Sequence, residues 1–519
     1  MMSTTAFRKS VSLLRKSVVL LLAAGGLLCA TEIPGYAARN PVDYYLGIPT
    51  SELRADGNPA WLMHSEYPNH LRYAVDYVNQ SGSLKLPFEP QRLSQSIASV
   101  SGNKMISQRG VFAGNFSYRN YLLSDKMWVH NGAPYTGNPF LLADSSVGDV
   151  SLNGLFWELN YAHALIPEKL DWGVSVFYNV DESVKQTFPK PIVHNRDLTL
   201  SSGLGYTFSS RIRTGLTLNY FDFQEIMKTG KYSLDQDKTP VFFKIRGLDN
   251  PIILHGVTSE ERLLALQGVR LTLDATLNQI LARLIRVSAG MESARACNED
   301  GGSYPIAQGD WFIQKYFYKL DILLPVHPKL GLDIHSTGNL NQQQGDHPDF
   351  NAEIYEFRTQ MLGGGFDLVY QFAPDGSVSP GWHFTSQTYK RIDKFNGILQ
   401  YVPSSILGYH ITSSLPGLGR LSAVLGVGLE TLTIGDPETF LALNGFYYDA
   451  ISKAEAEYLA ADKSELWLQA TLTWKSAAGT HYALESRWSR IQATGADLSD
   501  KDRNFLSLKL TIDQFPTSH

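Results

Sequence analysis

The fold of this chain is decided by residues 198–220, which read LTLSSGLGYTFSSRIRTGLTLNY. Apolar residues alternate with small or polar ones on both sides of the link Ser209–Arg211. One face carries Leu198, Leu200, Leu204, Tyr206, Phe208, Ile212, Leu216, Leu218 and Tyr220. A period of two indicates β-strands, and the tight link indicates an antiparallel hairpin.

The same alternation recurs from about residue 105 to the end of the chain, for example over 172–180, 366–372 and 466–475. We count roughly 14 to 18 such strands, and a single-chain outer-membrane barrel is expected to have an even number. The last segment alternates in the same way at Leu506, Leu508, Leu510 and Ile512 and reaches an aromatic residue at Phe515, which is typical of barrels inserted by the barrel assembly machinery.

Two architectures give this pattern. A soluble β-sandwich or propeller buries the apolar face in a core, whereas an outer-membrane barrel turns it toward lipid around a polar interior. The strands are about ten residues long, as membrane strands must be, and soluble strands average about five or six. Aromatic residues also lie near strand ends, as in an interfacial girdle. These features favour an all-β, transmembrane antiparallel β-barrel.

The composition excludes several classes of protein. Charged residues make up 18% of the 519 residues, below the roughly 25% of soluble domains, and aromatic residues make up 12%. The net charge of −5 provides no basic surface for nucleic acid, so we expect no nucleic-acid partner. Two Cys cannot build a disulfide scaffold.

The N-terminus has the order of a secretory signal peptide. Arg8, Lys9, Arg15 and Lys16 precede an apolar run over residues 18–30, and Gly-Tyr-Ala at 35–37 offers a cleavage site. The run is shorter than the roughly 20 residues of a membrane-spanning helix. We predict a signal peptide over 1–37 and a mature protein in the outer membrane of a Gram-negative bacterium.

The mature chain divides into two parts by pattern. Residues 38–104 are rich in Pro, Asn, Ser and Leu and show little alternation, so we interpret them as an N-terminal plug or periplasmic segment. Residues 105–519 form the predicted barrel. Residues 222–310 are irregular and are interpreted as a long loop insert, in which Thr258–Glu261 resembles a capping box and predicts a short helix.

Several motifs resemble a known family. They are residues 39–47, 57–60, 116–120, 123–126, 141–145 and 148–149. As a set they resemble an uncharacterised Bacteroidota-type outer-membrane β-barrel family, a domain of unknown function. The resemblance implies a barrel and no activity. Asn58, Pro59 and Ala60 also resemble the Asn-Pro-Ala of FadL-type fatty-acid channels, in which an N-terminal segment plugs the barrel.

The face opposite the apolar one is predicted to line the interior of the barrel. By parity it carries Arg119, Glu158, Asn160, Arg211, Arg213, Asn219, Asp367, His383, Gln387, Lys475, Glu485 and Arg487. Opposite charges on neighbouring strands could simply neutralise one another across the interior. Alternatively, they could form charged rings that select solutes. Arg211 and Arg213 could instead bind lipid head groups.

Three functions stay open. The first is a passive or gated channel for a small solute, including a hydrophobic one. The second is a non-transporting accessory barrel of a surface complex, which would add a protein partner to outer-membrane lipid and the barrel assembly machinery. The third is a barrel hydrolase, for which no Gly-x-Ser-x-Gly elbow is present. We expect no enzyme, no cofactor and no metal, since neither His-Glu-x-x-His nor a Cys pair occurs.

Overall fold

The structure, a computed structural model, describes most of the chain between residues 57 and 514. The described ranges are 57–64, 69–129, 135–230, 241–248, 251–255, 259–278, 284–349, 352–373, 376–418, 420–440, 448–476, 480–494, 498 and 501–514. The predicted signal peptide and Phe515 lie outside them. Within these ranges no helix is both long enough and apolar enough to cross a bilayer.

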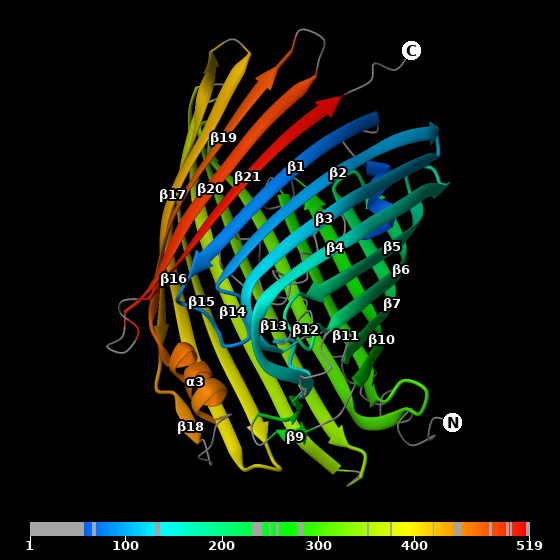
Figure 1. The fold of residues 1–519 in the computed structure, drawn as a ribbon. Helices are drawn as coiled ribbons and strands as arrows, with labels where there is room; N and C mark the ends of the chain where they lie inside the picture. Colours follow the sequence, from blue (N-terminus) through cyan, green and yellow to red (C-terminus); the bar gives the residue numbers. More distant parts are fainter. Residues whose placement is uncertain are drawn as a thin grey trace.

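Eighteen strands form a closed antiparallel barrel, which confirms the predicted fold class (Figure 1). The wall consists of β1 (Asn69–Gly82), β2 (Arg92–Ser107), β3 (Gly110–Val129), β4 (Phe140–Ile166), β5 (Leu170–Lys185), β6 (Ile192–Ser209), β7 (Ile212–Gly230), β10 (Ser259–Asn278), β11 (Leu284–Asp300), β12 (Ile306–His327), β13 (Leu330–His347), β14 (Ala352–Ala373), β15 (Gly376–Asp393), β16 (Ile398–Leu418), β17 (Leu421–Ile434), β19 (Lys463–Lys475), β20 (His481–Ala493) and β21 (Asp502–Gln514). Each wall strand pairs with the next, and β1 closes the ring on β21 from Leu71↔Gln514 to Gly82↔Arg503.

The two ends of the barrel differ in their connections. At one end, short links such as 108–109 and 210–211 join neighbouring strands, and β1 begins and β21 ends there; we call this the short-turn end (top of Figure 1). The opposite, long-loop end carries β8 (Val241–Arg246), β9 (Ile252–His255), β18 (Glu438–Phe440), the π-helix η3 (Tyr448–Ser452) and α3 (Lys453–Ala460). Short periplasmic turns and longer external loops are typical of outer-membrane barrels.

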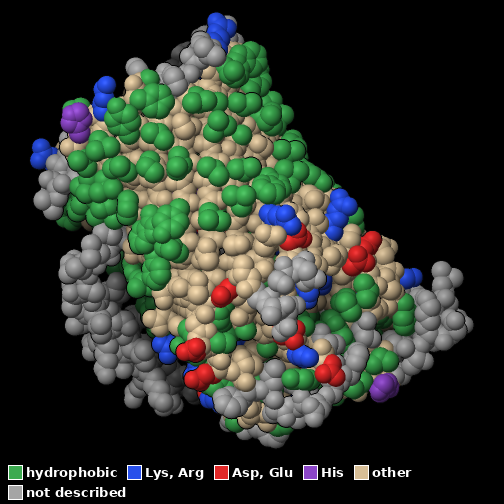
Figure 2. Space-filling view, turned by 90° about the vertical axis from the view of Figure 1, so that its left-hand side faces the viewer, with side chains coloured by type: hydrophobic (Ala, Val, Ile, Leu, Met, Phe, Trp, Pro, Cys, Tyr) green, Lys and Arg blue, Asp and Glu red, His purple; other side chains and the backbone are tan. Residues whose placement is uncertain are grey.

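The outer surface of the wall carries an apolar belt toward the short-turn end (Figure 2). Leu204, Tyr206, Leu216 and Leu218 have 43%, 40%, 40% and 54% of their surface exposed. A soluble sandwich would bury these residues between two sheets. These four residues face outward from a closed ring, so the predicted outward parity of the apolar face is confirmed.

The inner surface of the wall is polar and rich in small residues. Thr217 and Thr272, which pair with each other across β7 and β10, point inward and are buried, as are Ser117 and Asn160. Alternating apolar-out and polar-in positions are what a membrane barrel requires, because lipid and the interior contact successive residues of each strand.

The predicted boundary of the barrel at residue 105 is wrong. Strands β1 and β2 already belong to the wall, and they pair with each other from Asn69↔Lys104 to Ser81↔Arg92. Strand β2 was not predicted, because small outward residues such as Ser96 and Ala98 replace the usual leucines. The ring cannot close without β1, since β21 would then have an unpaired edge.

The predicted loop insert over residues 222–310 is also wrong in its larger part. Strand β7 continues to Gly230, and β10 and β11 are full wall strands. The helix predicted from the capping-box pattern is absent, because residues 259–278 pair on both sides, with β7 and with β11. Long-range pairing overrides this local signal.

The substitution Leu218→Arg, within the apolar belt, should destabilise the barrel in lipid. The expected loss is about 2–4 kcal/mol of unfolding free energy, because the charge would face hydrocarbon. Urea titration of the protein in lipid vesicles measures it. Ser209→Arg, at the short-turn end of β6, is the control and should cost only about 0–1 kcal/mol. Equal losses in both variants would contradict a lipid-facing belt.

Candidate functional site

A small sheet folds into the barrel at the long-loop end. Residues 140–143, the first part of β4, pair with β8 from Phe140↔Arg246 to Ala143↔Phe243. Strand β9 adds to the other edge of β8. We call these residues of β4, together with β8 and β9, the inner sheet. Phe140, Leu142 and Phe242 have no exposed surface.

One face of the inner sheet packs on the barrel wall. Phe140 contacts Ile354, Tyr355 and Phe357 of β14. Leu142 and Phe242 contact Val193 of β6 and Met227 of β7. The face therefore reaches wall strands on both sides of β10–β13, and it covers the inner surface at this end.

The other face of the inner sheet packs on connections from the opposite part of the ring. Leu141, Ala143, Phe243 and Ile245 share a buried cluster with Phe88, Trp128 and Ile451. Phe88 lies between β1 and β2, Trp128 lies near the end of β3, and Ile451 lies in η3. Because both faces are covered by parts of the protein, the inner sheet fills this part of the long-loop mouth.

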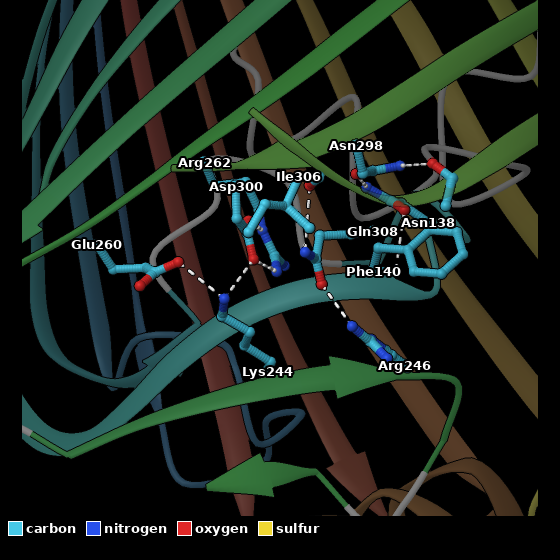
Figure 3. A network of polar contacts seen from close by, with 11 residues as sticks. Asn138, Phe140, Lys244, Arg246, Glu260, Arg262, Asn298, Asp300, Ile306 and Gln308 are labelled. Carbon is cyan, nitrogen blue, oxygen red and sulfur yellow. Dashed lines mark hydrogen bonds and ion pairs between the residues drawn. The ribbon is translucent and has the colours of Figure 1, made fainter. Parts of the chain in front are cut away.

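Charged side chains attach the inner sheet to the wall (Figure 3). Lys244 Nζ lies 2.8 Å from Glu260 Oε1 and 2.7 Å from Asp300 Oδ2. Asp300 also accepts two hydrogen bonds from the Arg262 guanidinium, at 2.6 and 3.0 Å, and both of these side chains are 2% exposed. Burial of such a network is costly unless every charge is paired, as these charges are.

Arg246 forms the second tie between β8 and the wall. Its Nη2 donates to Gln308 Oε1 at 2.7 Å, and its Nη1 lies 2.8 Å from His347 Nε2 (Figure 3 shows the Gln308 contact). A guanidinium can only donate, so His347 Nε2 must be the acceptor. Burial, and then the charge of Arg246, lower the pKa of His347 below its ordinary value. The ring is therefore neutral at neutral pH.

The residues before and after the inner sheet are fixed by amides and a carboxylate. Asn138 Nδ2 donates to Asn298 Oδ1 at 3.1 Å, and Asn138 Oδ1 accepts from Phe140 N at 3.0 Å (Figure 3). Beyond β8, the Leu248 N–H donates to the fully buried Asp393 at 2.8 Å. Neighbouring Gly247 has a φ of +99°, and a Cβ there would overlap the Asp393 carboxylate, so only glycine fits.

Asn58, Pro59 and Ala60, the predicted plug motif, lie on the inner face of the wall near the short-turn end. Asn58 Nδ2 donates to the Leu204 carbonyl at 2.8 Å. The 3-10 helix η1 (Pro59–His64) follows, and Trp61 Nε1 donates to Asp274 Oδ1 at 2.5 Å. These described residues are attached to one sector of the wall, so a plug formed by the whole N-terminal segment stays a prediction.

Four glycines on the inner face of the wall leave room for the N-terminal segment at residues 58–64. Gly173 of β5, Gly203 and Gly205 of β6 and Gly215 of β7 all face it. A Cβ at Gly203 would overlap the Asn58 carboxamide, and one at Gly205 would lie 2.8 Å from the Trp61 ring. The alternation of glycine with Leu204 and Tyr206 thus serves two contacts at once, lipid outside and the N-terminal segment inside.

The predicted lumen residues lie in separate sectors. In β3 and β4, Arg119 is 2% exposed with its guanidinium 4.9 Å from the Phe156 ring centre, and Glu158, 3% exposed, accepts a hydrogen bond from Asn160 at 3.3 Å. Arg211, Arg213 and Lys475 lie at or beside short connections. No single site collects all the predicted residues.

Asn219 lies on β7, and the other predicted residues lie on β14, β15 and β20. Asp367 accepts from His410 Nε2 at 2.7 Å, and His383 Nε2 lies 3.8 Å from Glu430 Oε1. Arg487 lies over the Trp467 ring at 5.3 Å, and Glu485 precedes it by two residues on the same face of β20. His410, Glu430 and Trp467 were not predicted. Each has inward parity next to an outward apolar residue, so the alternation alone could have identified them.

The inner sheet was not predicted from the sequence. Its strands at 140–143 and 241–246 are only four and six residues long, too short to give a clear period. Lys244 and Arg246 resemble solvent-exposed residues in sequence. The available signal was an apolar segment inside a predicted loop, which only a buried position explains.

Residues 59–513 match DUF6850, a family of unknown function. No curated protein matches the chain. Among solved structures, the ferric preacinetobactin receptor BauA from Acinetobacter baumannii is similar at 9% identity, with 86% of this chain and 80% of that chain covered and a TM-score of 0.41. A Pseudomonas aeruginosa FadL homologue is similar at 10% identity, with 88% and 93% covered and a TM-score of 0.32. These likenesses concern the barrel fold alone.

Gly203→Ala should detach the N-terminal segment from the wall, because its methyl group would occupy the position of the Asn58 carboxamide. We expect a change in tryptophan fluorescence as Trp61 leaves Asp274, and faster proteolysis near residue 60, with the barrel still folded. Gly331→Ala, where a Cβ meets only atoms at 3.9 Å or beyond, is the matched control. Unchanged proteolysis in Gly203→Ala would contradict the close contact.

Acidification should loosen β8. The folded pKa of His347 is depressed, so the packed arrangement binds fewer protons than an open one and loses stability as pH falls below about 6.5. Hydrogen exchange of the β8 amides, corrected for the intrinsic effect of pH, should show weaker protection at about pH 5.5 than at about pH 7.5. His347→Gln should remove most of this difference; if it persists unchanged, His347 is not the group responsible.

Proposed function

We propose that this chain, which belongs to the DUF6850 family of unknown function, is a gated outer-membrane channel for small solutes, and that the inner sheet is its gate. The described structure then corresponds to the closed state. The observation that carries this proposal is the attachment of the inner sheet by Lys244 and Arg246.

The buried contacts of Lys244 and Arg246 favour a movable gate over an inner sheet that fills the barrel permanently. Replacing a buried ion pair by well-packed apolar residues is often neutral or stabilising, so a purely structural filling has no need of charges. Charged side chains suit an inner sheet that moves between a closed and an open position, because water can solvate Lys244 and Arg246 when their contacts with the wall break. Lys244 and Arg246 share a face of β8 with the apolar Phe242, which packs on the wall.

The inner wall supports passage of polar or charged solutes. Residues such as Asp367, His383, Glu485 and Arg487 provide both charge signs between the gate and the short-turn end. Arg211, Arg213 and Lys475 lie near the short-turn mouth and would meet a solute as it leaves. The charged-ring selectivity inferred from the sequence remains part of this proposal.

The apolar belt on the wall supports a location in the outer membrane of a Gram-negative bacterium. Export by the signal peptide over 1–37, insertion by the barrel assembly machinery and contact with outer-membrane lipid belong to the same proposal. The short-turn end would then face the periplasm and the long-loop end the cell exterior.

An accessory barrel of a surface complex is the second candidate. The observation in its favour is the extra structure between β17 and β19, where β18, η3 and α3 stand at the long-loop end (Figure 1). Arg391 Nη2 lies 2.8 Å from Glu455 Oε1 of α3 and fixes the helix to the wall. Such an element, fixed at the long-loop end, could hold a partner. The described histidine hydrogen bonds run to carboxylates, Tyr161, Arg246 and the backbone N–H of Lys329, and they do not favour a hydrolase.

Releasing the gate should raise conductance. In planar bilayers, the double variant Lys244→Ala/Arg246→Ala should show at least a tenfold higher frequency of open events than the wild type. Breaking a buried ion pair costs about 3–5 kcal/mol, and each 1.4 kcal/mol changes a population about tenfold.

The matched control is Arg295→Ala. Arg295 forms an exposed ion pair with Asp310 on the outer face, so its loss should leave conductance unchanged. If neither the wild type nor the double variant conducts ions or takes up sugars and amino acids in liposome swelling, the channel proposal fails and the accessory barrel becomes the better reading.

A further inference from the structure

A row of rings and glycines crosses the inner face of β13–β19. In the cross-strand register, His335 faces Gly365, Gly365 faces His383, and His383 faces Gly408. One step nearer the short-turn end, Gly381 faces His410, His410 faces Gly428, and Gly428 faces Trp467. Each ring thus has a glycine beside it in the sheet.

The glycines let the rings lie against the wall. A Cβ at Gly365 would lie 2.5 Å from His335 Nε2, and a Cβ at Gly408 would overlap the His383 ring. The His383 and His410 ring centres are 6.3 Å apart, and those of His410 and Trp467 are 6.2 Å apart. Packing therefore fixes where the imidazole nitrogen atoms point.

Three of the buried side chains beside this row have polar atoms without partners. They are both ring nitrogens of His383, both carboxylate oxygens of Glu430, and Oε2 of Glu465. The three residues are 2%, 3% and 5% exposed. Buried polar groups are almost always hydrogen-bonded, so these five atoms lack the hydrogen-bond partner that such a position normally has.

The two glutamates also place two negative charges side by side in a buried position. Glu430 and Glu465 are direct cross-strand partners on β17 and β19, and both point inward. Like charges in such positions repel each other, and buried charges require compensation. Arg487 lies nearby over the Trp467 ring and forms no salt bridge with either glutamate within the described part of the chain.

The distance between His383 and Glu430 indicates what is missing. Their Nε2 and Oε1 atoms are 3.8 Å apart. This exceeds a hydrogen bond, which reaches about 3.2 Å. It is shorter than twice a zinc–ligand distance of about 2.0–2.1 Å, so an ion fits between the two atoms. Among the described residues, no three ligating side chains already surround one point, so a third ligand has to rotate in.

We propose that His383, Glu430 and Glu465 bind one divalent first-row transition-metal ion on the inner wall. His383 Nε2 and a Glu430 oxygen form the first two ligands, and Glu465 rotates to become the third. Two carboxylates match a charge of +2, and an imidazole ligand suits transition metals better than calcium or magnesium. The site does not require the inner sheet to be a gate.

Cobalt and zinc are the probes that test this site. Purified full-length protein without a His tag is titrated with Co²⁺ in detergent, followed by visible absorption, and then with Zn²⁺ by calorimetry. The wild type should bind one ion per chain with a tetrahedral or five-coordinate cobalt spectrum. His383→Ala and the double variant Glu430→Gln/Glu465→Gln should each bind at least tenfold more weakly.

His194→Ala is the matched control. His194 and Glu182 form an exposed pair at 3.4 Å on the outer face and could bind a metal adventitiously. This variant should retain the wild-type affinity, and heat modifiability on gels confirms that each variant is folded. The proposal is overturned if the wild type gives no cobalt spectrum, or if only His194→Ala lowers the affinity. It is also overturned if the folded site variants bind as tightly as the wild type.

Discussion

The pairing of β1 with β21 is the constraint on which the rest of the structure depends. In a bilayer, no water satisfies an unpaired backbone N–H or C=O group, so every strand must have a neighbour on both sides. The register from Leu71↔Gln514 to Gly82↔Arg503 gives the first and last strands that neighbour. The ring fixes which face of each strand meets lipid, and it encloses an interior that the protein itself must fill or leave to water.

Different segments of the chain occupy the interior at the two ends of the barrel. At the short-turn end, glycines at 173, 203, 205 and 215 bring the backbone of the N-terminal segment close to the wall. At the long-loop end, the chain inserts a sheet whose apolar residues pack on both sides, while Lys244 and Arg246 find buried partners. Between them, the ring-and-glycine row on β13–β19 includes buried polar atoms without a hydrogen-bond partner among the described residues.

The sequence was sufficient to predict the barrel, because strands that contact lipid repeat a simple signal. Leu204, Tyr206, Leu216 and Leu218 face outward as the alternation requires. It was insufficient where pairing between distant segments decides the structure. Small residues at Ser96 and Ala98 concealed β2, and the local helix signal near Thr258 concealed the start of β10. The inner sheet could not be predicted, because parity places a residue on the inner face and does not show what lies opposite it. The same limit applies to Glu430 and Glu465, whose meeting depends on the pairing of β17 with β19.

Strand β4 is one continuous strand of 27 residues, which begins in the inner sheet and ends at the short-turn end (Figure 1). The bulges opposite it in β3, between Leu123 and Lys126 and between Met127 and Trp128, lie where it bends from the wall toward the centre. The inner sheet therefore cannot leave the interior of the barrel as a detached body, in contrast to a separate plug domain. Any displacement of Phe140 must be absorbed as torsion of a strand that is also part of the wall. The two mouths of the protein are thus mechanically coupled through a single stretch of backbone.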